Sequence, residues 1–170
     1  VDSILTSIRA ADADVVVLIE LGDAPARQLD EILAGYPHRV ATPRIDRPTG
    51  PARSVIASRF PLTAIRDRPD GLHAVGASLR TPLGRLNVIG VHLTRPWPFQ
   101  EQWGQISQAM ALQAVVEGLE GPVVVAGDFN SAPSARIGKQ VRRDIGLHPA
   151  PGFPGTWPAQ LPAPLGVTID

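Results

Sequence analysis

Three apolar runs dominate this sequence, and a polar side chain follows each of them. The runs are VVVLI, LNVIGV and VVVAG, at residues 15–19, 86–91 and 123–127. The first run is typical of a strand that is buried on both faces, the second indicates another buried strand, and the third is a further β-branched run. Glu20, His92 and Asp128 follow the three runs, and Asn130 comes two residues after Asp128. Because ligand sites form where loops meet at strand ends, the pattern predicts one polar site that several strands build together.

The spacing of apolar residues predicts helices between these strands. The expected helical ranges are 3–11, 24–34, 99–118 and 135–144. In the second range, Asp23 is the expected N-cap, and Gly35 is a stop signal. In the third range, Trp103, Ile106 and Met110 lie at helical spacing, and we expect Trp103 on the buried face.

Shorter patterns predict the remaining strands. Residues 54–58 (SVIAS) and 166–170 (GVTID) have strand-like sequences, and residues 72–80 alternate like a half-buried antiparallel strand. The TPLG sequence at 81–84 is typical of a tight turn, which would join the alternating strand to the run before His92. Strands and helices therefore alternate while some strands are antiparallel, which indicates an α/β fold with mixed sheets.

The composition fits one globular domain and excludes several classes of protein. Sixteen Lys and Arg balance 16 Asp and Glu among 170 residues, and this zero net charge argues against a nonspecific nucleic-acid binder. The chain has no cysteine, which excludes a disulfide framework, a thiolate zinc site and a cysteine nucleophile. No apolar run in the sequence approaches the ~20 residues that span a membrane.

The polar residues at the strand ends suit the chemistry of a divalent cation and a phosphate ester. Carboxylate and amide oxygens are hard ligands for Mg²⁺, which takes one or two carboxylates and keeps several waters. In this interpretation Glu20 binds Mg²⁺, or Mn²⁺ in its place, and Asp128 orients or deprotonates the attacking water. Asn130 holds a phosphate oxygen, and His92 donates a proton to the phosphate or to the leaving group.

Each of these residues also has a purely structural interpretation. Glu20 would then form a buried salt bridge, and His92 would be a packed, hydrogen-bonded histidine. Asp128 and Asn130 would form an Asx-turn without a chemical role. Three polar strand ends in one chain favour the chemical interpretation over these alternatives.

Several short motifs resemble the endonuclease/exonuclease/phosphatase superfamily, whose members have the DNase I-like fold. The motifs are ADVVVLIE (13–20), SRFP (58–61), GVHLTRP (90–96), GDFNSAPS (127–134), GTWP (155–158) and GVTID (166–170). They follow the order of the family along nearly the whole chain, and GDFNSAPS is the most specific of them. The resemblance implies two mixed β-sheets packed face to face, with helices on the outside.

The resemblance also implies a role for each matching residue. Glu20 is similar to the metal-binding glutamate of the family, and His92 to the histidine near the scissile phosphate. Asp128 and Asn130 are similar to the Asp–Asn pair that positions the water and the phosphate. Asp170 is similar to the Asp of a closing Asp-His motif, in which it orients the catalytic imidazole.

The chain departs from the family pattern in three places. Ile19 stands where the family usually has Gln before the metal-binding glutamate. The catalytic His of the family is expected directly after Asp170, where the sequence ends, and the first strand of the family is expected before Val1. We therefore interpret residues 1–170 as a single domain that lacks the first strand and the C-terminal end. As a fragment truncated at both ends, it is expected to show weak activity or none.

Aromatic and basic residues near these motifs allow two interpretations each. Trp97 is a candidate for substrate binding, as a ring that stacks on a base or touches a lipid, or else a packed side chain. Arginines crowd residues 44–68, and basic residues return at 136–143. These groups could steer an anionic substrate, but we expect them to be solvated faces.

The sequence thus predicts a Mg²⁺-dependent phosphoesterase that hydrolyses a phosphodiester or phosphomonoester by in-line attack of water. The alternative is a non-catalytic or truncation-inactivated member that acts as a binding or structural domain. The expected partner is a phosphate-ester substrate, namely a nucleic acid, a phospholipid or a small phosphoester, and the protein is expected to be a monomer. By resemblance alone, we expect an extracytoplasmic domain of a membrane-anchored bacterial protein.

Overall fold

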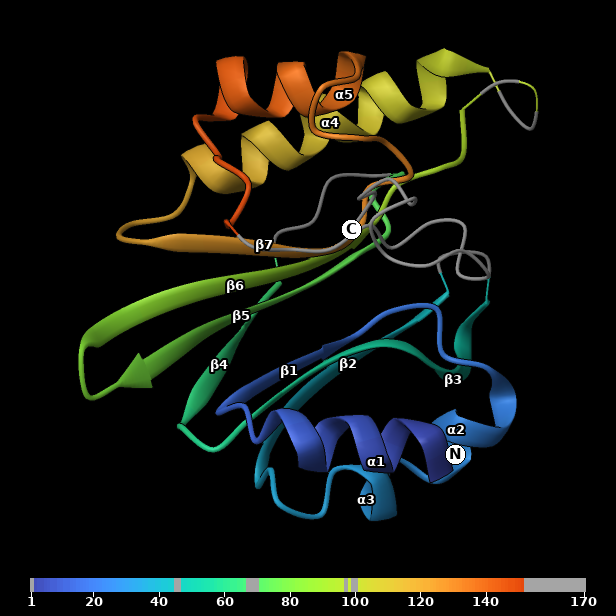
Figure 1. Ribbon diagram of the computed structural model, residues 1–170, viewed down its shortest axis with the longest axis vertical. Helices are drawn as coiled ribbons and strands as arrows, with labels where there is room; N and C mark the ends of the chain where they lie inside the picture. Colours follow the sequence, from blue (N-terminus) through green and yellow to red (C-terminus); the bar gives the residue numbers. More distant parts are fainter. Residues whose placement is uncertain (1, 45–46, 67–70, 97, 99–100, 152–170) are drawn as a thin grey trace.

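Two β-sheets pack face to face, and helices cover the outer face of each sheet (Figure 1). The computed structural model describes residues 2–44, 47–66, 71–96, 98 and 101–151. One sheet has three strands and the other has four. This arrangement confirms the two-sheet sandwich that the motifs imply.

The three-stranded sheet is antiparallel and has the order β1-β3-β2. Its strands are β1 (Val15–Leu18), β2 (His38–Arg44) and β3 (Arg47–Ser58). The helices on its outer face are α1 (Asp2–Ala11), α2 (Asp23–Arg27) and α3 (Leu29–Ile32). Within the described residues β1 is an edge strand, and its side chains are only half-buried, so the expected burial of this strand on both faces is wrong.

The four-stranded sheet is mixed and has the order β4-β5-β6-β7. Its strands are β4 (Leu62–Ile65), β5 (Ala74–Thr81), β6 (Gly84–His92) and β7 (Val123–Asp128). Strands β6 and β7 are parallel, whereas the other neighbours are antiparallel. Over its outer face lie α4 (Gln102–Glu117), α5 (Arg136–Gln140) and the π-helical turn η1 (Val141–Ile145).

The predicted hairpin between β5 and β6 is confirmed. Thr81 and Gly84 are paired at its end, and the Thr81 hydroxyl donates a hydrogen bond of 2.8 Å to the Gly84 carbonyl. Along β5, Val75, Ala77 and Leu79 are buried against the other sheet, as the alternation predicts. The expected strand at 166–170 lies outside the described residues.

Gly90 lets the two sheets approach each other near the end of β6. A methyl group at this position would lie 2.8 Å from Val17 Cγ1, 2.9 Å from Val75 Cγ1 and 3.1 Å from Ile19 Cδ1. Real side-chain carbons essentially never come that close, so only glycine allows this packing. The contact places the end of β1 against β6, two residues before His92.

The helix expected over 24–34 is divided into α2 and α3 at Gln28. Gly22 is the residue before α2, and Asp23 makes no cap but lies within the first turn. Its carboxylate accepts a hydrogen bond of 2.6 Å from Arg53 on β3. Arg53 therefore binds the Asp23 side chain, which the sequence predicts to be an N-cap.

The expected buried face of the long helix is wrong. In α4, Trp103 is 69% exposed and Met110 is 58% exposed. The buried face carries Gln105, Ile106, Gln108, Ala109 and Leu112. Two glutamines occupy buried positions because loop groups satisfy their side-chain amides, as described below. None of the helices in the described part of the chain is long and apolar enough to span a membrane.

Candidate active site

His92 and Asp128 lie side by side at the carboxyl ends of two parallel strands. The register of β6 and β7 places the two residues directly opposite each other. His92 Nε2 is 3.9 Å from Asp128 Oδ2, and each side chain is 26% exposed. This separation is too long for a direct hydrogen bond, yet both groups can reach one small ligand.

Gly127 allows the strand that carries Asp128 to run close to β6. Its φ of 136° lies in a region that other residues rarely adopt. A Cβ atom here would lie only 2.0 Å from the Val91 carbonyl oxygen, on the strand that carries His92. The glycine of the GDFN sequence is therefore required for the close pairing that brings the two polar side chains together.

The loop after β7 is built from the same polar residues that are candidates for chemistry. The Asn130 backbone N–H donates a hydrogen bond of 2.7 Å to Asp128 Oδ1, which is the Asx-turn of the structural interpretation. The Asn130 side-chain amide donates a bond of 2.8 Å to the Leu93 carbonyl and so joins the two loops. The second Asp128 oxygen, Oδ2, is the one near His92. The Asx-turn therefore coexists with the side-chain pair and does not exclude a chemical role.

Two buried glutamines of α4 hold these loops from behind. Gln105 donates hydrogen bonds to the carbonyls of Phe129 and Asn130, at 2.9 and 3.3 Å. Gln108 accepts a bond of 2.8 Å from the Thr94 N–H and donates one of 3.1 Å to the Gly71 carbonyl. The motifs did not identify these residues. One signal in the sequence could have identified them. The two glutamines are three residues apart and therefore lie on the same helix face, beside its apolar positions.

Replacing Gln105 with Leu should loosen the loop that carries Asn130. The change keeps the volume but removes two donors, and an unpaired buried carbonyl costs about 1–3 kcal/mol. We expect a lower free energy of unfolding in urea and faster amide exchange of Asn130. The same change at Gln113, which bonds only to Glu117 in its own helix, is the control. Equal losses in the two variants would contradict this role.

Glu20 follows β1, on the other sheet. It is exposed and has a φ of 56°, a left-handed conformation that is uncommon for glutamate. The next residue is fixed, because the Leu21 N–H donates to the Arg53 carbonyl at 2.9 Å and the Arg53 guanidinium donates to the Leu21 carbonyl. Strained backbone of this kind is found more often at functional sites.

Glu20 is the candidate cation ligand among the described residues. No three His, Asp or Glu side chains of this part of the chain lie close enough to hold an ion together. Mg²⁺ does not need such a cluster, since one or two carboxylates and several waters satisfy it. The Glu20 carboxylate is exposed and has no hydrogen bond or ion pair within the described residues.

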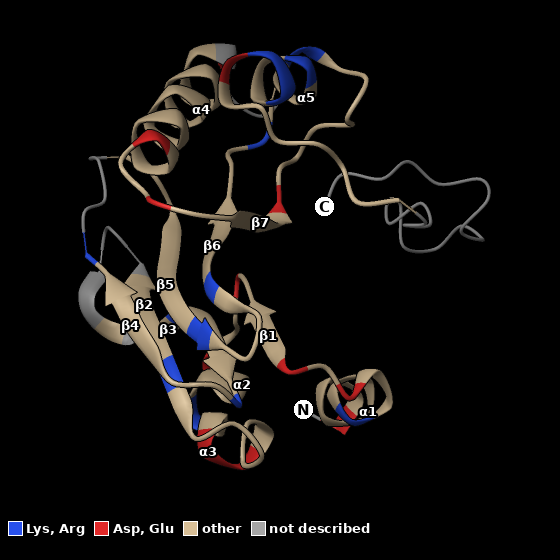
Figure 2. Cartoon of the chain, turned by 90° about the vertical axis from the view of Figure 1, so that its left-hand side faces the viewer, with Lys and Arg blue, Asp and Glu red and all other residues tan. Residues whose placement is uncertain are grey.

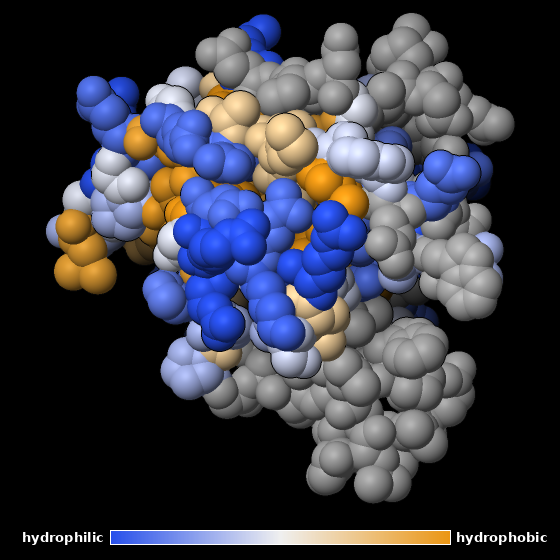
Figure 3. Space-filling model, turned by 90° about the horizontal axis from the view of Figure 1, so that it is seen from above, coloured by the Kyte–Doolittle hydropathy of each residue, from blue (hydrophilic) through white to orange (hydrophobic). Residues whose placement is uncertain are grey.

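Two predicted site residues, Trp97 and Asp170, lie outside the described residues. The expected solvated face is wrong for Arg53, whose side chain is 23% exposed and bonds to Asp23 and to the Leu21 carbonyl. It is confirmed for four exposed basic residues, Arg136, Lys139, Arg142 and Arg143. They belong to the largely hydrophilic surface over α5 and η1, at the top of the molecule (Figures 2 and 3). The Arg143 guanidinium donates two hydrogen bonds to Asp144 and holds the pKa of that carboxyl below its usual value.

The sequence of the chain matches a known family over its whole length. Residues 1–170 match the model of the Endonuclease/Exonuclease/phosphatase family, and the chain belongs to this family. A comparison with curated protein sequences gives no significant match. The members of the family and the similar structures are hydrolases that act on phosphoester bonds.

Solved structures of the DNase I-like fold are similar to this chain. A Staphylococcus aureus beta toxin variant with bound magnesium ions has a TM-score of 0.71 at 17% identity, over 94% of this chain and 67% of the toxin. Sphingomyelinase C from Streptomyces griseocarneus has a TM-score of 0.62 at 20% identity, over 88% of this chain and 64% of the enzyme. The human Nocturnin catalytic domain, with a bound sulfate anion, has a TM-score of 0.62 at 21% identity, over 84% of this chain and 60% of that domain.

These similarities confirm the fold. One further similar structure, ANGEL2, is described as a 2′,3′-cyclic phosphatase and is 25% identical, with a TM-score of 0.56, over 78% of this chain and 44% of that protein. The chain thus spans about 64% of the sphingomyelinase and less of ANGEL2.

Proposed function

We propose that this protein is a Mg²⁺-dependent phosphoesterase that hydrolyses a phosphodiester or phosphomonoester by in-line attack of water. The observation that carries the proposal is the pair of His92 Nε2 and Asp128 Oδ2, 3.9 Å apart at one edge of the sheet. A base and an acid at this spacing can serve two oxygens of one phosphate ester. Membership in a family of phosphoester hydrolases supports this interpretation.

Glu20 is the residue that we propose to hold the cation, Mg²⁺ or Mn²⁺. A bound divalent ion would neutralise negative charge on the phosphate ester. The carboxylate of Glu20 is exposed, and the residue before it, Ile19, packs beside Gly90 of β6. The magnesium ions bound to the beta toxin support the same choice of metal.

The other residues act on the water and the phosphate. Asp128 Oδ2 orients the water and accepts its proton, while Oδ1 stays bonded to the Asn130 N–H and fixes the carboxylate. Asn130 Nδ2 has two N–H groups, of which one donates to the Leu93 carbonyl, and we assign the other to a phosphate oxygen. His92 Nε2 gives a proton to the phosphate or to the leaving oxygen. We assign to Asp170 the role of orienting the catalytic imidazole of the family's closing Asp-His motif, which is not that of His92. We assign contact with the substrate to Trp97.

The proposed substrate carries an accessible phosphate ester. It is a phospholipid, a nucleic acid or a small phosphoester. The similarity to a sphingomyelinase supports a phospholipid, and the similarity to a cyclic phosphatase supports a nucleotide. The zero net charge disfavours nonspecific binding to nucleic acid. We propose that the protein acts as a monomer, outside the cytoplasm.

The metal dependence and the role of Glu20 can be tested together. Chelation of divalent ions should abolish hydrolysis of bis-p-nitrophenyl phosphate or sphingomyelin, and added Mg²⁺ or Mn²⁺ should restore it. Glu20→Gln should raise the Mg²⁺ concentration for half-maximal rate about tenfold or more. Glu31→Gln on α3, also exposed, is the matched control. Identical Mg²⁺ titrations for the two variants would contradict the role of Glu20. Calorimetry that finds no Glu20-dependent binding of Mg²⁺ or of a phosphate ligand would favour the non-catalytic alternative.

A further inference from the structure

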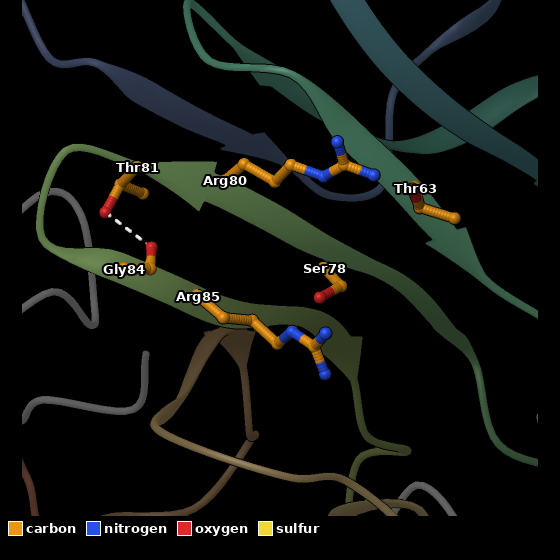
Figure 4. A pocket seen from close by; sticks show the side chains of 6 residues that line it. All are labelled: Thr63, Ser78, Arg80, Thr81, Gly84 and Arg85. Carbon is orange, nitrogen blue, oxygen red and sulfur yellow. Dashed lines mark hydrogen bonds between the residues drawn. The ribbon is translucent and has the colours of Figure 1, made fainter.

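A pocket lined by polar side chains lies at the other end of the four-stranded sheet. Its volume is about 560 Å³, and residues of β4, β5 and β6 line it (Figure 4). The lining residues are Thr63, Ser78, Arg80, Thr81, Gly84 and Arg85. Arg85 and His92 stand near opposite ends of β6, so at about 3.3 Å per residue the pocket is about 23 Å from the candidate active site.

The strand register brings two arginines together in this pocket. Arg80 on β5 and Arg85 on β6 are direct cross-strand partners, and Thr63 and Ser78 are direct partners on β4 and β5. Because side chains alternate along a strand, Ser78 and Arg80 lie on the same face of β5. Figure 4 shows the two guanidinium groups extending in the same direction, with Ser78 near them.

This arrangement leaves positive charge poorly balanced. Like charges on directly opposed residues of a sheet are destabilising. Among the described residues, the one ion pair that these two arginines form joins Arg85 Nη1 to Glu120 Oε2, at 3.9 Å. Both partners of that pair are exposed, at 62% and 94%, and such surface pairs contribute little. Within the same residues Arg80 has no ion pair, and the hydroxyls of Thr63 and Ser78 have no hydrogen-bond partner.

We propose that this pocket binds a phosphate-type dianion. Guanidinium groups present donors in a planar fork that matches the oxygens of a phosphate, and hydroxyl groups add single hydrogen bonds. Arg80 and Arg85 supply two forks, and Ser78 and Thr63 supply two hydroxyls from the neighbouring strands. The anion removes the repulsion between the two arginines, so binding and folding stability are linked. The site is distinct from the catalytic one and uses none of its residues.

The first experiment titrates inorganic phosphate into the protein, in chelator and without divalent cations. The parent chain keeps the Asp128 carboxylate, which repels an anion from the candidate active site when no cation is bound. We expect saturable binding with one equivalent and a rise in the melting temperature. Arg80→Gln and Arg85→Gln should each weaken binding about tenfold or more, since each removes a charge-assisted donor pair. Arg27→Gln, an exposed arginine on α2, should bind phosphate like the parent.

The same variants have a second readout, which does not depend on binding. Without phosphate, Arg80→Gln and Arg85→Gln should melt at the same temperature as the parent or higher, because the repulsion between the two guanidinium groups is gone. Added phosphate should then raise the melting temperature of the parent but not that of the variants. The absence of saturable phosphate binding to the parent, or equal binding by all variants, would overturn the proposal.

A further arm identifies the source of the phosphate group. Leu83, which is fully exposed at the turn between the two arginines, would contact a membrane surface if the anion is a lipid headgroup. Vesicles of phosphatidylcholine with phosphatidic acid should then sediment the protein, and Arg80→Gln and Leu83→Ser should each reduce this binding. Binding of free phosphate without binding to these vesicles assigns the site to a soluble phosphate compound.

Discussion

Measured in the full-length protein, Asp128→Asn should lower kcat/KM for a phosphodiester substrate by about 10³-fold while it leaves the fold nearly unchanged. The asparagine amide oxygen can still accept the hydrogen bond of 2.7 Å from the Asn130 N–H, so the turn after β7 is kept. What is lost is the carboxylate charge and the basic oxygen that faces His92. General bases contribute about 10²–10⁴-fold to rate, which sets the size of the expected effect.

Asp128→Ala separates the chemical role from the structural one. This variant also loses the acceptor of the turn, and we expect a further loss of about 1–2 kcal/mol in the free energy of unfolding relative to Asp128→Asn. The measurements are steady-state kinetics and urea unfolding of both variants. Full activity of Asp128→Asn would show that the carboxylate serves only the Asx-turn, and the assignment of the base would be wrong.

Gly127→Ala should destabilise the protein by more than about 4 kcal/mol or prevent folding. The alanine Cβ would lie 2.0 Å from the Val91 carbonyl oxygen, and that backbone atom is held in the pairing of β6 and β7. The φ of 136° adds a conformational cost that alanine cannot avoid. Losses of this size are exceptional for single substitutions and indicate a specific steric cause.

Gly121→Ala is the control that isolates the backbone cost. Gly121 precedes the same strand and has a φ of 91°, but a Cβ there would have no atom within 4 Å. We expect a loss of about 1–2 kcal/mol, from the left-handed conformation alone. Thermal and urea unfolding of both variants give the comparison. If the two substitutions cost the same, the close approach of Gly127 to β6 is not what fixes this part of the sheet.

The strands marked by apolar runs or by a tight turn were predictable from the sequence, whereas β2 (His38–Arg44), β4 (Leu62–Ile65) and the division of one helix were not. Continuous β-branched runs and the TPLG turn are local signals, and the structure forms strands and a hairpin there. Asp23 was predicted as a cap because neighbours alone were considered, but Arg53, 30 positions away, binds its carboxylate. Long-range partners of this kind leave no trace in local spacing.

The long helix shows a second limit. Apolar residues lie on several sides of α4, so spacing alone does not define the buried face. Trp103 was placed inside on that basis and lies outside, whereas Gln105 is buried. The glutamine is buried because the carbonyls of Phe129 and Asn130 need its donors, and that need arises only after the loops are placed.

The candidate site was predictable to the extent that it depends on strand ends. His92, Asp128 and Asn130 come together because β6 and β7 are parallel neighbours, and parallel pairing is a usual result of a strand–helix–strand sequence. The place of Glu20 depends instead on how one sheet packs against the other. No local pattern fixes that, and the roles of these four residues remain predictions.

The contact of the two sheets at Gly90 affects the geometry of the proposed site. Glu20 follows a strand of one sheet, and His92 and Asp128 end strands of the other, with Val17, Ile19 and Gly90 between them. The distance between Glu20, the proposed cation ligand, and Asp128, the proposed proton acceptor, therefore depends on how closely the apolar side chains of the two sheets pack. Larger or smaller aliphatic side chains at Val17 or Ile19 should therefore change the metal affinity and the turnover, although neither residue has a proposed role in the reaction.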